Sequence, residues 1–341
     1  MCSPLVSIVI RTHNRAPLLR IALKSLINQT YRPIEIFVVD HNSNDDTRSV
    51  VTSFGSQVIY YRHTGCYRDT FNVWRDKING KFVSVLDDDD FLKPNCIENL
   101  VKVLKENCNI DIVFARHIFF RSDHGDYIFD KISPQINVNK IRNLLMTGNV
   151  IPWNAVLFRR HCLDGITKIG SSISGAFDWF FWIQMAIAGY KFSQINDILG
   201  FIRRSPDSVQ YNTKMMGKGV IDCIVYYGRH ISLLNRLFIG YYYILGYRLI
   251  CYGIICLENG NPRIGRRYIL KGLFKYLFAI RNRIKLIPAI IIFYASLISN
   301  YKKSRLRIEN IFKVNLFRNY HQKDDMKSIL ETVSFWNIMK T

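Results

Sequence analysis

The chain has 341 residues, of which 49% are apolar and 13% aromatic, enough to build one large domain or two ordinary ones. Eight cysteines occur without a Cys-x-x-Cys pair, which argues against a zinc site and a disulfide scaffold and favours a reducing compartment. The N-terminus runs directly into an apolar strand pattern, so we expect no secretory signal peptide.

The formal net charge of +21 is unevenly distributed along the chain. Residues 1–214 carry 26 Lys and Arg against 20 Asp and Glu, whereas residues 215–341 carry 21 against 6. We therefore predict a domain boundary near residue 214, followed by a basic C-terminal domain.

The first hundred residues alternate between strand and helix patterns. Helical spacing or helix-start signals occur at 17–26, from 47, at 71–78 and after Pro94. Mostly apolar runs that predict buried strands lie at 4–11, 34–39, 58–62 and 82–86. This alternation predicts an α/β fold with a mostly parallel sheet and helices on both faces.

Three polar turns follow the first, second and fourth predicted strands, at 12–15, 40–46 and 87–90. The carboxyl ends of parallel strands share one edge of a sheet, where ligands bind in open α/β folds. Four adjacent carboxylates, Asp87 to Asp90, repel one another unless a cation lies among them, and hard oxygen ligands suit Mg²⁺ or Mn²⁺ shared with substrate phosphates. We predict a nucleotide site here; the alternative is a solvated acidic turn. No Gly-x-Gly-x-x-Gly or P-loop pattern follows the first strand.

Residues 110–205 are less regular. Strands are predicted at 110–117 and 155–159, a loop at 144–152 and a helix at 177–189. Asp178 precedes an aromatic run, where desolvation would raise its proton affinity and suit it to general base catalysis. Alternatively, it caps the helix by accepting backbone N–H bonds, and one residue can do both.

Five segments, in this order, resemble a family 2 glycosyltransferase with the GT-A fold. They are PLVSIVIRTHNR, VVDHNSNDDT, GKFVSVLDDDDFLKP, GNVIPWNAVLFRR and FDWFFWIQMAIAGY, within residues 4–205. The resemblance implies a nucleotide-sugar-binding half over 1–108 and an acceptor and catalytic half over 109–214. It also implies inverting transfer of a sugar from a nucleotide diphosphate, with UDP as the family's commonest carrier, to an acceptor hydroxyl.

The resemblance further implies roles for individual residues. Asp87 and Asp89 are the acids of an Asp-x-Asp pattern, in which Asp89 would bind the metal, with Asp87 or Asp88 on the ribose or the metal waters. Asp178 would be the catalytic base. The residues assigned to the nucleotide sugar are Thr12, His13, Asn14, Arg15, Asp40, Arg68, Asn72, Asp87 and Asp88, with Asp89 and Asp87 at the metal.

Three positions depart from the family pattern. Phe177 replaces the Glu of a Glu-Asp pair, Phe71 replaces an Arg, so that Arg68 would supply the cation, and Ser205 replaces a frequent His, which puts a third protein ligand for the metal in question. On the acceptor side the candidates are Trp153, Asn154 and Trp179, because aromatic faces stack on sugar rings, although such aromatic residues more often belong to a core.

The basic C-terminal region has a helical charge pattern. Residues 263–307 contain twelve Lys and Arg and no Asp or Glu, with cations repeating every four residues from Arg263 to Lys275. We expect amphipathic helices whose cationic face binds an anionic membrane surface; a solvated helical domain is the alternative, and no nucleic-acid-binding module is recognised. The stretches 237–257 and 286–298 fit transmembrane spans poorly, because the first contains Arg248 and the second is short and contains Pro288.

Together these patterns predict a metal-dependent, inverting glycosyltransferase, peripheral on the cytoplasmic face of the cell membrane, that modifies a glycan or lipid-linked acceptor. A nucleotidyltransferase is one rival, although it would normally carry a Gly-rich basic loop after the first strand. A non-catalytic membrane-surface protein with a degenerate transferase domain is the other. The three departures favour that second rival, and the intact acids oppose it.

Overall fold

The computed structural model describes residues 3–65, 69–123, 126–166, 173, 175–205, 213–238 and 241–277. The strands are β1 (Val6–Thr12), β2 (Ile34–Asp40), β3 (Val58–Arg62), β4 (Phe82–Asp87), β5 (Phe91–Leu92), β6 (Ile112–Asp123), β7 (Asp126–Ile132), β8 (Val156–Arg159) and β9 (Phe192–Arg203). The α-helices are α1 (Ala16–Ile27), α2 (Thr47–Thr52), α3 (Thr70–Val73), α4 (Cys96–Glu106), α5 (Ile141–Thr147), α6 (Phe177–Ala188), α7 (Thr213–Arg229), α8 (Leu233–Phe238), α9 (Tyr241–Glu258) and α10 (Pro262–Leu277).

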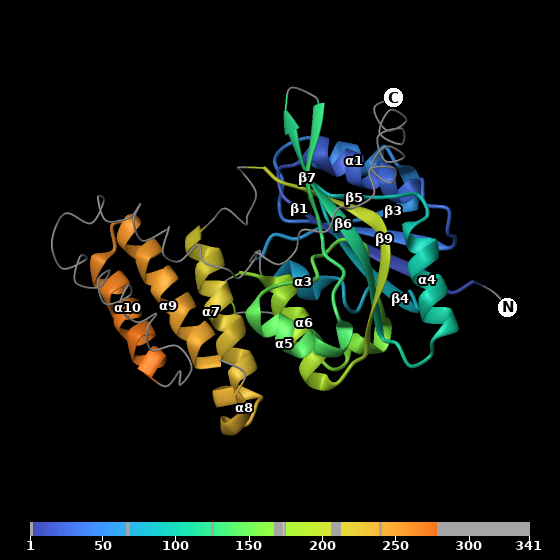
Figure 1. The fold of residues 1–341 in the computed structure, drawn as a ribbon. Coiled ribbons are helices and arrows are strands. Elements are labelled where there is room, and N and C mark those ends of the chain that lie inside the picture. The colour runs from blue at the N-terminus through green and yellow to red at the C-terminus, as the bar shows by residue number, and fades with distance from the viewer. Residues whose placement is uncertain are drawn as a thin grey trace.

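In the part of the chain that is described, the strands form one sheet in the order β3-β2-β1-β4-β8-β6-β9-β5, with β7 paired to β6 (Figure 1). Strands β3, β2, β1 and β4 run parallel. In β1, Val6, Ile8 and Ile10 pack with residues of α1, α2 and α4, whereas Val9 packs with residues of α3, α5 and α6 on the other face. Burial on both faces explains why the strand sequences read as continuous apolar runs.

The second half of the sheet is mixed. Strand β8 is antiparallel to β4 and β6, β9 is parallel to β6, and the short β5 is antiparallel to β9. The predicted α/β sheet with helices on both faces is therefore present, and its parallel part is the N-terminal half. Two local predictions were wrong, because residues 144–147 belong to α5 and the helix expected at 71–78 is the short α3.

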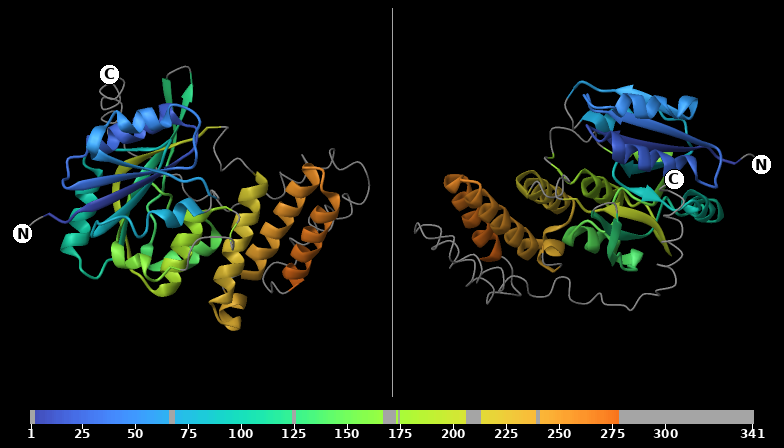
Figure 2. Two further views of the ribbon diagram at one scale, coloured as in Figure 1. Left: turned by 180° about the vertical axis from the view of Figure 1, so that it is seen from behind. Right: turned by 90° about the horizontal axis from the view of Figure 1, so that it is seen from above.

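A helical unit of α7, α9 and α10 lies beside the sheet, and Figure 2 shows it from two further directions. Helix α7 packs against α6, α9 against α7, and α10 against α9. The last two helices approach closely at glycines: a Cβ on Gly253 would lie 2.7 Å from the Gly265 carbonyl oxygen, and one on Gly272 would lie 2.7 Å from that of Gly246. Small residues therefore bring the two backbones together.

No helix among the described residues combines the length and the apolar character required to cross a bilayer. Most of the stretch 237–257 lies in α9, whereas residues 286–298 fall outside the described ranges, as does the part of 263–307 beyond residue 277. The composition boundary near residue 214 falls within the first turn of α7.

Candidate active site

The polar turns that follow β1, β2 and β4 meet at one edge of the sheet. The strand register sets Thr12 opposite Asp40 and Arg11 opposite Asp87. The predicted convergence of strand ends is therefore confirmed. It follows directly from the parallel pairing of neighbouring strands in this half of the sheet.

The last acid of the run, Asp90, holds the two halves of the sheet together. It is buried, and its carboxylate accepts hydrogen bonds from the backbone N–H of Arg203 at 2.9 Å and from Asn154 Nδ2 at 3.2 Å. Desolvation raises the pKa of Asp90 well above its usual value. Asp90 therefore ties β9 and the segment before β8 to the acidic turn and has a structural role.

Asp88 and Asp89 are bridged by an arginine from the turn after β1. Arg15 Nη1 lies 3.1 Å from Asp88 Oδ1 and 3.0 Å from Asp89 Oδ2. Thr12 Oγ1 also donates to Asp88, at 2.7 Å. Desolvation and the charge of Asp89 raise the pKa of Asp88 to about 6, while Arg15 and Thr12 oppose the rise. Both carboxylates thus lie in a site that favours positive charge.

Asp87 is the most accessible of these three acids, with 46% of its side chain exposed. Arg11 Nη2 lies 4.0 Å from its Oδ1. Desolvation raises the pKa of Asp87 to about 8, and repulsion from Asp89, Asp178 and Asp88 adds to the rise, while Arg11 opposes it. The mutual repulsion of these carboxylates is relieved by any cation placed among them.

Asp178 lies in the first turn of α6, and its two oxygens have separate partners. Oδ1 accepts the backbone N–H of Trp179 at 2.8 Å, and Oδ2 accepts Asn149 Nδ2 at 2.5 Å. The residue at the N-cap is Ala176, in the left-handed region with φ 55°, so Asp178 is not the N-cap. Desolvation raises the pKa of Asp178, while these hydrogen bonds and the charge of Arg11 oppose the rise.

The turns after β1 and β2 hold each other in place. His13 Nδ1 lies 2.6 Å from the His41 carbonyl oxygen, and Asn14 Oδ1 accepts the backbone N–H of Asn44 at 2.8 Å. Asp40, assigned to the nucleotide base, is buried and accepts hydrogen bonds from the Ser43 backbone at 2.9 Å and from Tyr60 Oη at 2.5 Å. The nucleotide role of these three residues stays a prediction.

The three acceptor candidates are buried and serve in packing. Trp153 contacts the rings of Phe71, Phe181 and Trp182, with centroids 4.9–5.8 Å away. Trp179 donates its Nε1–H to the Leu145 carbonyl at 2.6 Å. Asn154 bonds Asp90 and the Phe201 carbonyl. Because all three are at most 2% exposed, we assign Trp153, Asn154 and Trp179 to the core and correct the acceptor-side prediction.

Of the remaining predicted residues, one is not described by the structure and the others lie on or beside α3 and α6. Arg68 lies outside the described residues. Asn72 lies on α3, half-buried, while its neighbour Phe71 is fully buried in the aromatic core. Phe177, which stands in place of an acid, is also buried in the core.

Three residues at the edge were missed. Arg11 lies one residue before the turn at which the predicted site began. A prediction that included the last residues of the strand would have identified it. Asn149 and Arg203 come from distant parts of the chain; Arg203 Nε donates to the Asp89 carbonyl at 3.3 Å, and its guanidinium lies 4.8 Å from the Phe120 ring centroid. Only tertiary structure brings these two to the site.

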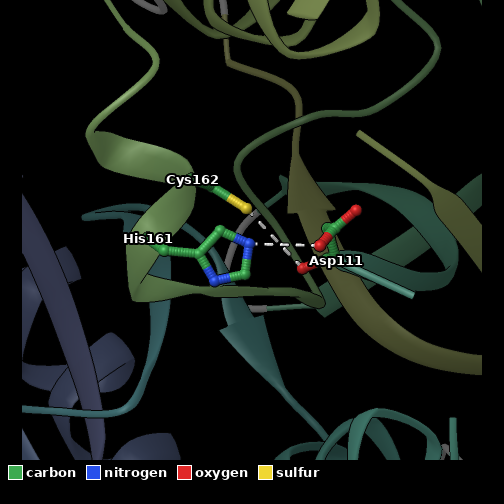
Figure 3. A group of neighbouring side chains, drawn as sticks. All are labelled: Asp111, His161 and Cys162. Carbon is green, nitrogen blue, oxygen red and sulfur yellow. Dashed lines mark hydrogen bonds and ion pairs between the residues drawn. The ribbon is translucent and has the colours of Figure 1, made fainter. Parts of the chain in front are cut away.

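A second group of potential ligands, Asp111, His161 and Cys162, lies where β6 begins (Figure 3). Asp111 Oδ1 is 3.2 Å from His161 Nε2, and its Oδ2 accepts the Lys191 backbone N–H at 2.8 Å. Desolvation raises the pKa of the buried Cys162 to about 12, so its thiol is protonated. These contacts fasten the start of β6 to the segment after β8, at the opposite end of the strands from Asp87.

The carboxylates of Asp87 and Asp89 fit a divalent metal ion. They offer hard oxygen ligands at one sheet edge, which suits Mg²⁺ or Mn²⁺, and the charges of Asp89 and Asp88 add to the rise that desolvation causes in the pKa of Asp87. Arg15 already pairs with Asp89, so positive charge is accommodated at this position.

Comparison with known proteins identifies the class of this domain. Residues 7–165 match the model of glycosyl transferase family 2. An uncharacterised glycosyltransferase of Rickettsia prowazekii is 28% identical over 205 residues, covering 58% of this chain and 61% of that protein. One of Nostoc is 29% identical over 176 residues, covering 48% and 53%. Residues 7–165 thus form a glycosyl transferase family 2 domain, in a chain that spans about six-tenths or less of the length of these relatives.

Solved structures share the fold across most of the chain. The 1–349 fragment of S. aureus TarS in complex with UDP-GlcNAc matches with a TM-score of 0.61 at 16% identity, covering 89% of this chain and 91% of that one. The mannosyltransferase PcManGT from Pyrobaculum calidifontis, in complex with GDP-Man and Mn²⁺, gives 0.51 at 16% identity, covering 92% and 89%. The predicted GT-A fold with a C-terminal helical extension is confirmed.

Proposed function

We propose that this protein transfers a sugar from a UDP-sugar to a hydroxyl of a glycan or lipid-linked acceptor, with inversion at the anomeric carbon. The observation that carries the proposal is the gathering of three carboxylates, Asp87 to Asp89, with two arginines at the sheet edge, where the charge of Asp178 also acts on Asp87. A carboxylate held by hydrogen bonds on α6, together with a set of carboxylates suited to a metal at a single sheet edge, matches what this reaction requires.

Asp178 is the proposed general base. Its hydrogen bonds from Asn149 and Trp179 orient the carboxylate, and desolvation raises its pKa toward the value that suits proton abstraction. In this role Asp178 accepts the proton of the acceptor hydroxyl while the hydroxyl oxygen attacks the anomeric carbon. The bond to the diphosphate breaks on the opposite face, so the configuration inverts.

Asp89 and Asp87 are the proposed metal ligands, with Asp88, Thr12 and Arg15 holding the turn that presents them. A bound Mn²⁺ or Mg²⁺ would supply Lewis-acid stabilisation of the diphosphate leaving group. Arg11 and Arg15 contribute fixed positive charge beside the same oxygens. The metal-containing PcManGT neighbour and the UDP-GlcNAc-bound TarS neighbour support a metal and a UDP-sugar.

The turn residues His13 and Asn14, together with Asp40, Asn72 and Arg68, are proposed for the nucleotide. The basic region from residue 263 is proposed to hold the protein at the anionic inner face of the cell membrane, where a lipid-linked acceptor is available. The absence of any nucleic-acid-binding module from the sequence favours a membrane over a nucleic acid.

The test is release of nucleoside diphosphate from a panel of UDP- and GDP-sugars, with Mn²⁺ and after chelation by EDTA. We expect turnover with a UDP-sugar that requires the metal. Binding of donor without turnover under every condition would contradict catalysis and favour a degenerate domain. Turnover with GDP-sugars alone would overturn the UDP assignment while leaving the reaction class intact.

A further inference from the structure

A groove of ≈ 670 Å³ runs along the helical unit, far in sequence from the acidic edge. Its lining comes from α7, α9 and α10, including Leu245 and Leu249 of α9 and Leu270 and Phe274 of α10. This volume lies within the range typical of pockets that bind small amphiphilic ligands. The groove is mostly apolar, although it opens to solvent.

Two of these apolar side chains are well exposed on the surface of α10. Leu270 is 50% exposed and Phe274 is 57% exposed, one turn apart on α10. A pair of large apolar side chains that rims an apolar groove is a feature of surfaces that bind a partner or a membrane. The groove is therefore suited to an apolar ligand.

Cations surround the apolar lining. Lys218 lies on α7, and Lys271 and Lys275 lie on α10, next in sequence to the two exposed apolar residues. Asp222 is the one acid among the described residues that line the groove, and it forms an ion pair with Lys218. The lining thus has an excess of positive charge, which selects for an occupant that is both apolar and anionic.

Charge distinguishes among the candidate occupants. Residues 286–301 of this chain contain no charged residue, so they would suit the apolar lining but leave the lysines without an anionic partner. A second copy would present the same cationic face. An anionic membrane lipid meets both requirements, since its chain suits the lining and its phosphate suits the lysines.

We propose that this groove binds an anionic membrane phospholipid, with its acyl chain between α7 and α10 and its phosphate at Lys218, Lys271 and Lys275. The proposal specifies how the basic region would meet a membrane, and it can be tested without donor or acceptor. Helix α7 lines the groove and also contacts Ala176 through Cys223, whose Sγ lies 3.8 Å from the Ala176 carbonyl. A lipid in the groove would therefore lie one helix away from the segment that carries Asp178.

The first experiment is sedimentation of the full chain with vesicles of phosphatidylglycerol and phosphatidylcholine, compared with phosphatidylcholine alone. We expect binding only to the anionic vesicles. Lys271→Glu with Lys275→Glu should weaken this binding about thirtyfold or more. Lys102→Glu with Lys105→Glu, the same change of charge at two exposed lysines of α4 outside the basic region, is the matched control and should weaken it much less. An equal loss of vesicle binding in both double variants would overturn the proposed lipid site, as would failure of the full chain to bind anionic vesicles.

The second experiment tests apolar insertion with conservative changes that preserve the helix. Phe274→Trp places a fluorophore at the groove, and Ile264→Trp places one at a position on α10 that is 46% exposed but does not line it. Brominated acyl chains should quench the emission added by the first variant and spare that of the second. Equal quenching of both tryptophans would contradict insertion of an acyl chain into the groove. Thermal shifts with UDP-sugars, measured on all these variants, should stay unchanged, so that a failure of lipid binding is distinguishable from a failure of the proposed transferase function.

Discussion

Two charged regions of this protein are built in different ways. At the acidic edge, Asp87 to Asp90 and Asp178 are held by backbone N–H groups, arginines, two asparagines and a threonine, at distances between 2.5 and 4.0 Å. On the helical unit, the lysines at the groove extend from helix surfaces. Fixed charges with specific partners form a site that one substitution can abolish, whereas lysines at a surface act additively.

The largest expected effect is that of removing the proposed base. Asp178→Asn keeps the size of the side chain and can still hydrogen-bond, but it cannot accept the acceptor's proton. We expect kcat to fall about 10²–10⁴-fold. Donor affinity, measured by calorimetry, should stay nearly unchanged. A comparable loss of donor binding would show that Asp178 acts on the nucleotide sugar instead.

The next effect concerns the proposed metal ligand. Thermal unfolding of wild type with a UDP-sugar and Mn²⁺ at about 100 times Kd should show a stabilisation of roughly 2.7 kcal/mol. Asp89→Ala should lose this metal-dependent shift. Asp46→Ala is the matched control, because Asp46 is an exposed acid in the turn after β2 whose side chain makes no capping hydrogen bond. An unaltered shift in Asp89→Ala would exclude Asp89 as a ligand.

The helical unit should be sensitive to volume at its glycine contacts. A Cβ on Gly265 would lie 2.6 Å from Leu257 Cγ and 2.7 Å from the Gly253 carbonyl oxygen. Gly265→Leu should therefore destabilise the α9–α10 pair by about 1–3 kcal/mol, measured by urea unfolding. Ile264→Leu at the neighbouring exposed position should change stability by less than about 0.5 kcal/mol. Equal stability of both variants would contradict the close helix contact.

A smaller effect, on pH dependence, is expected from Asn149. Its amide donates to Asp178 and lowers the carboxyl pKa, against the rise caused by desolvation. Asn149→Ala should raise that pKa further, because the charged form of the carboxyl loses a hydrogen bond that stabilises it. The base must be ionised, so the acidic limb of kcat/KM should move to higher pH while the rate at alkaline pH is retained. A uniform loss of rate at every pH would indicate a general structural role.

The smallest effect is expected from a single lysine of the groove. Lys275→Gln should weaken binding to phosphatidylglycerol vesicles about fivefold, equivalent to about 1 kcal/mol per cation near an anionic surface. Sedimentation at increasing salt should reduce wild-type binding as well, because salt screens surface charges. A complete loss of binding in Lys275→Gln would mean that this lysine acts as a specific anchor, and the contrast with the acidic edge would then fail.

Prediction from sequence succeeded best where local pattern and tertiary burial agree. The apolar runs that became β1, β2 and β4 are largely buried on both faces, so their sequence pattern could be interpreted without knowing their neighbours. Strand β9 was missed because its sequence, FSQINDILGFIR, mixes polar and apolar residues in a strand that is only partly buried. Trp153 and Trp179 were predicted on the acceptor side for a related reason. The sequence alone does not distinguish an aromatic residue that packs in a core from one that stacks on a sugar.

The sequence by itself determined the α/β architecture, the shared edge of the strand ends, the acids gathered there and the basic composition of the chain after residue 214. These features depend on periodicity, composition and short-range order, which the chain carries locally. Tertiary structure alone decided that Arg15 bridges Asp88 and Asp89, that Asn149 holds Asp178, that Asp90 is structural, and that three helices enclose an apolar groove rimmed by lysines. Each of these depends on contacts between residues far apart in the chain, and such contacts form only when the whole sheet and its helices pack together.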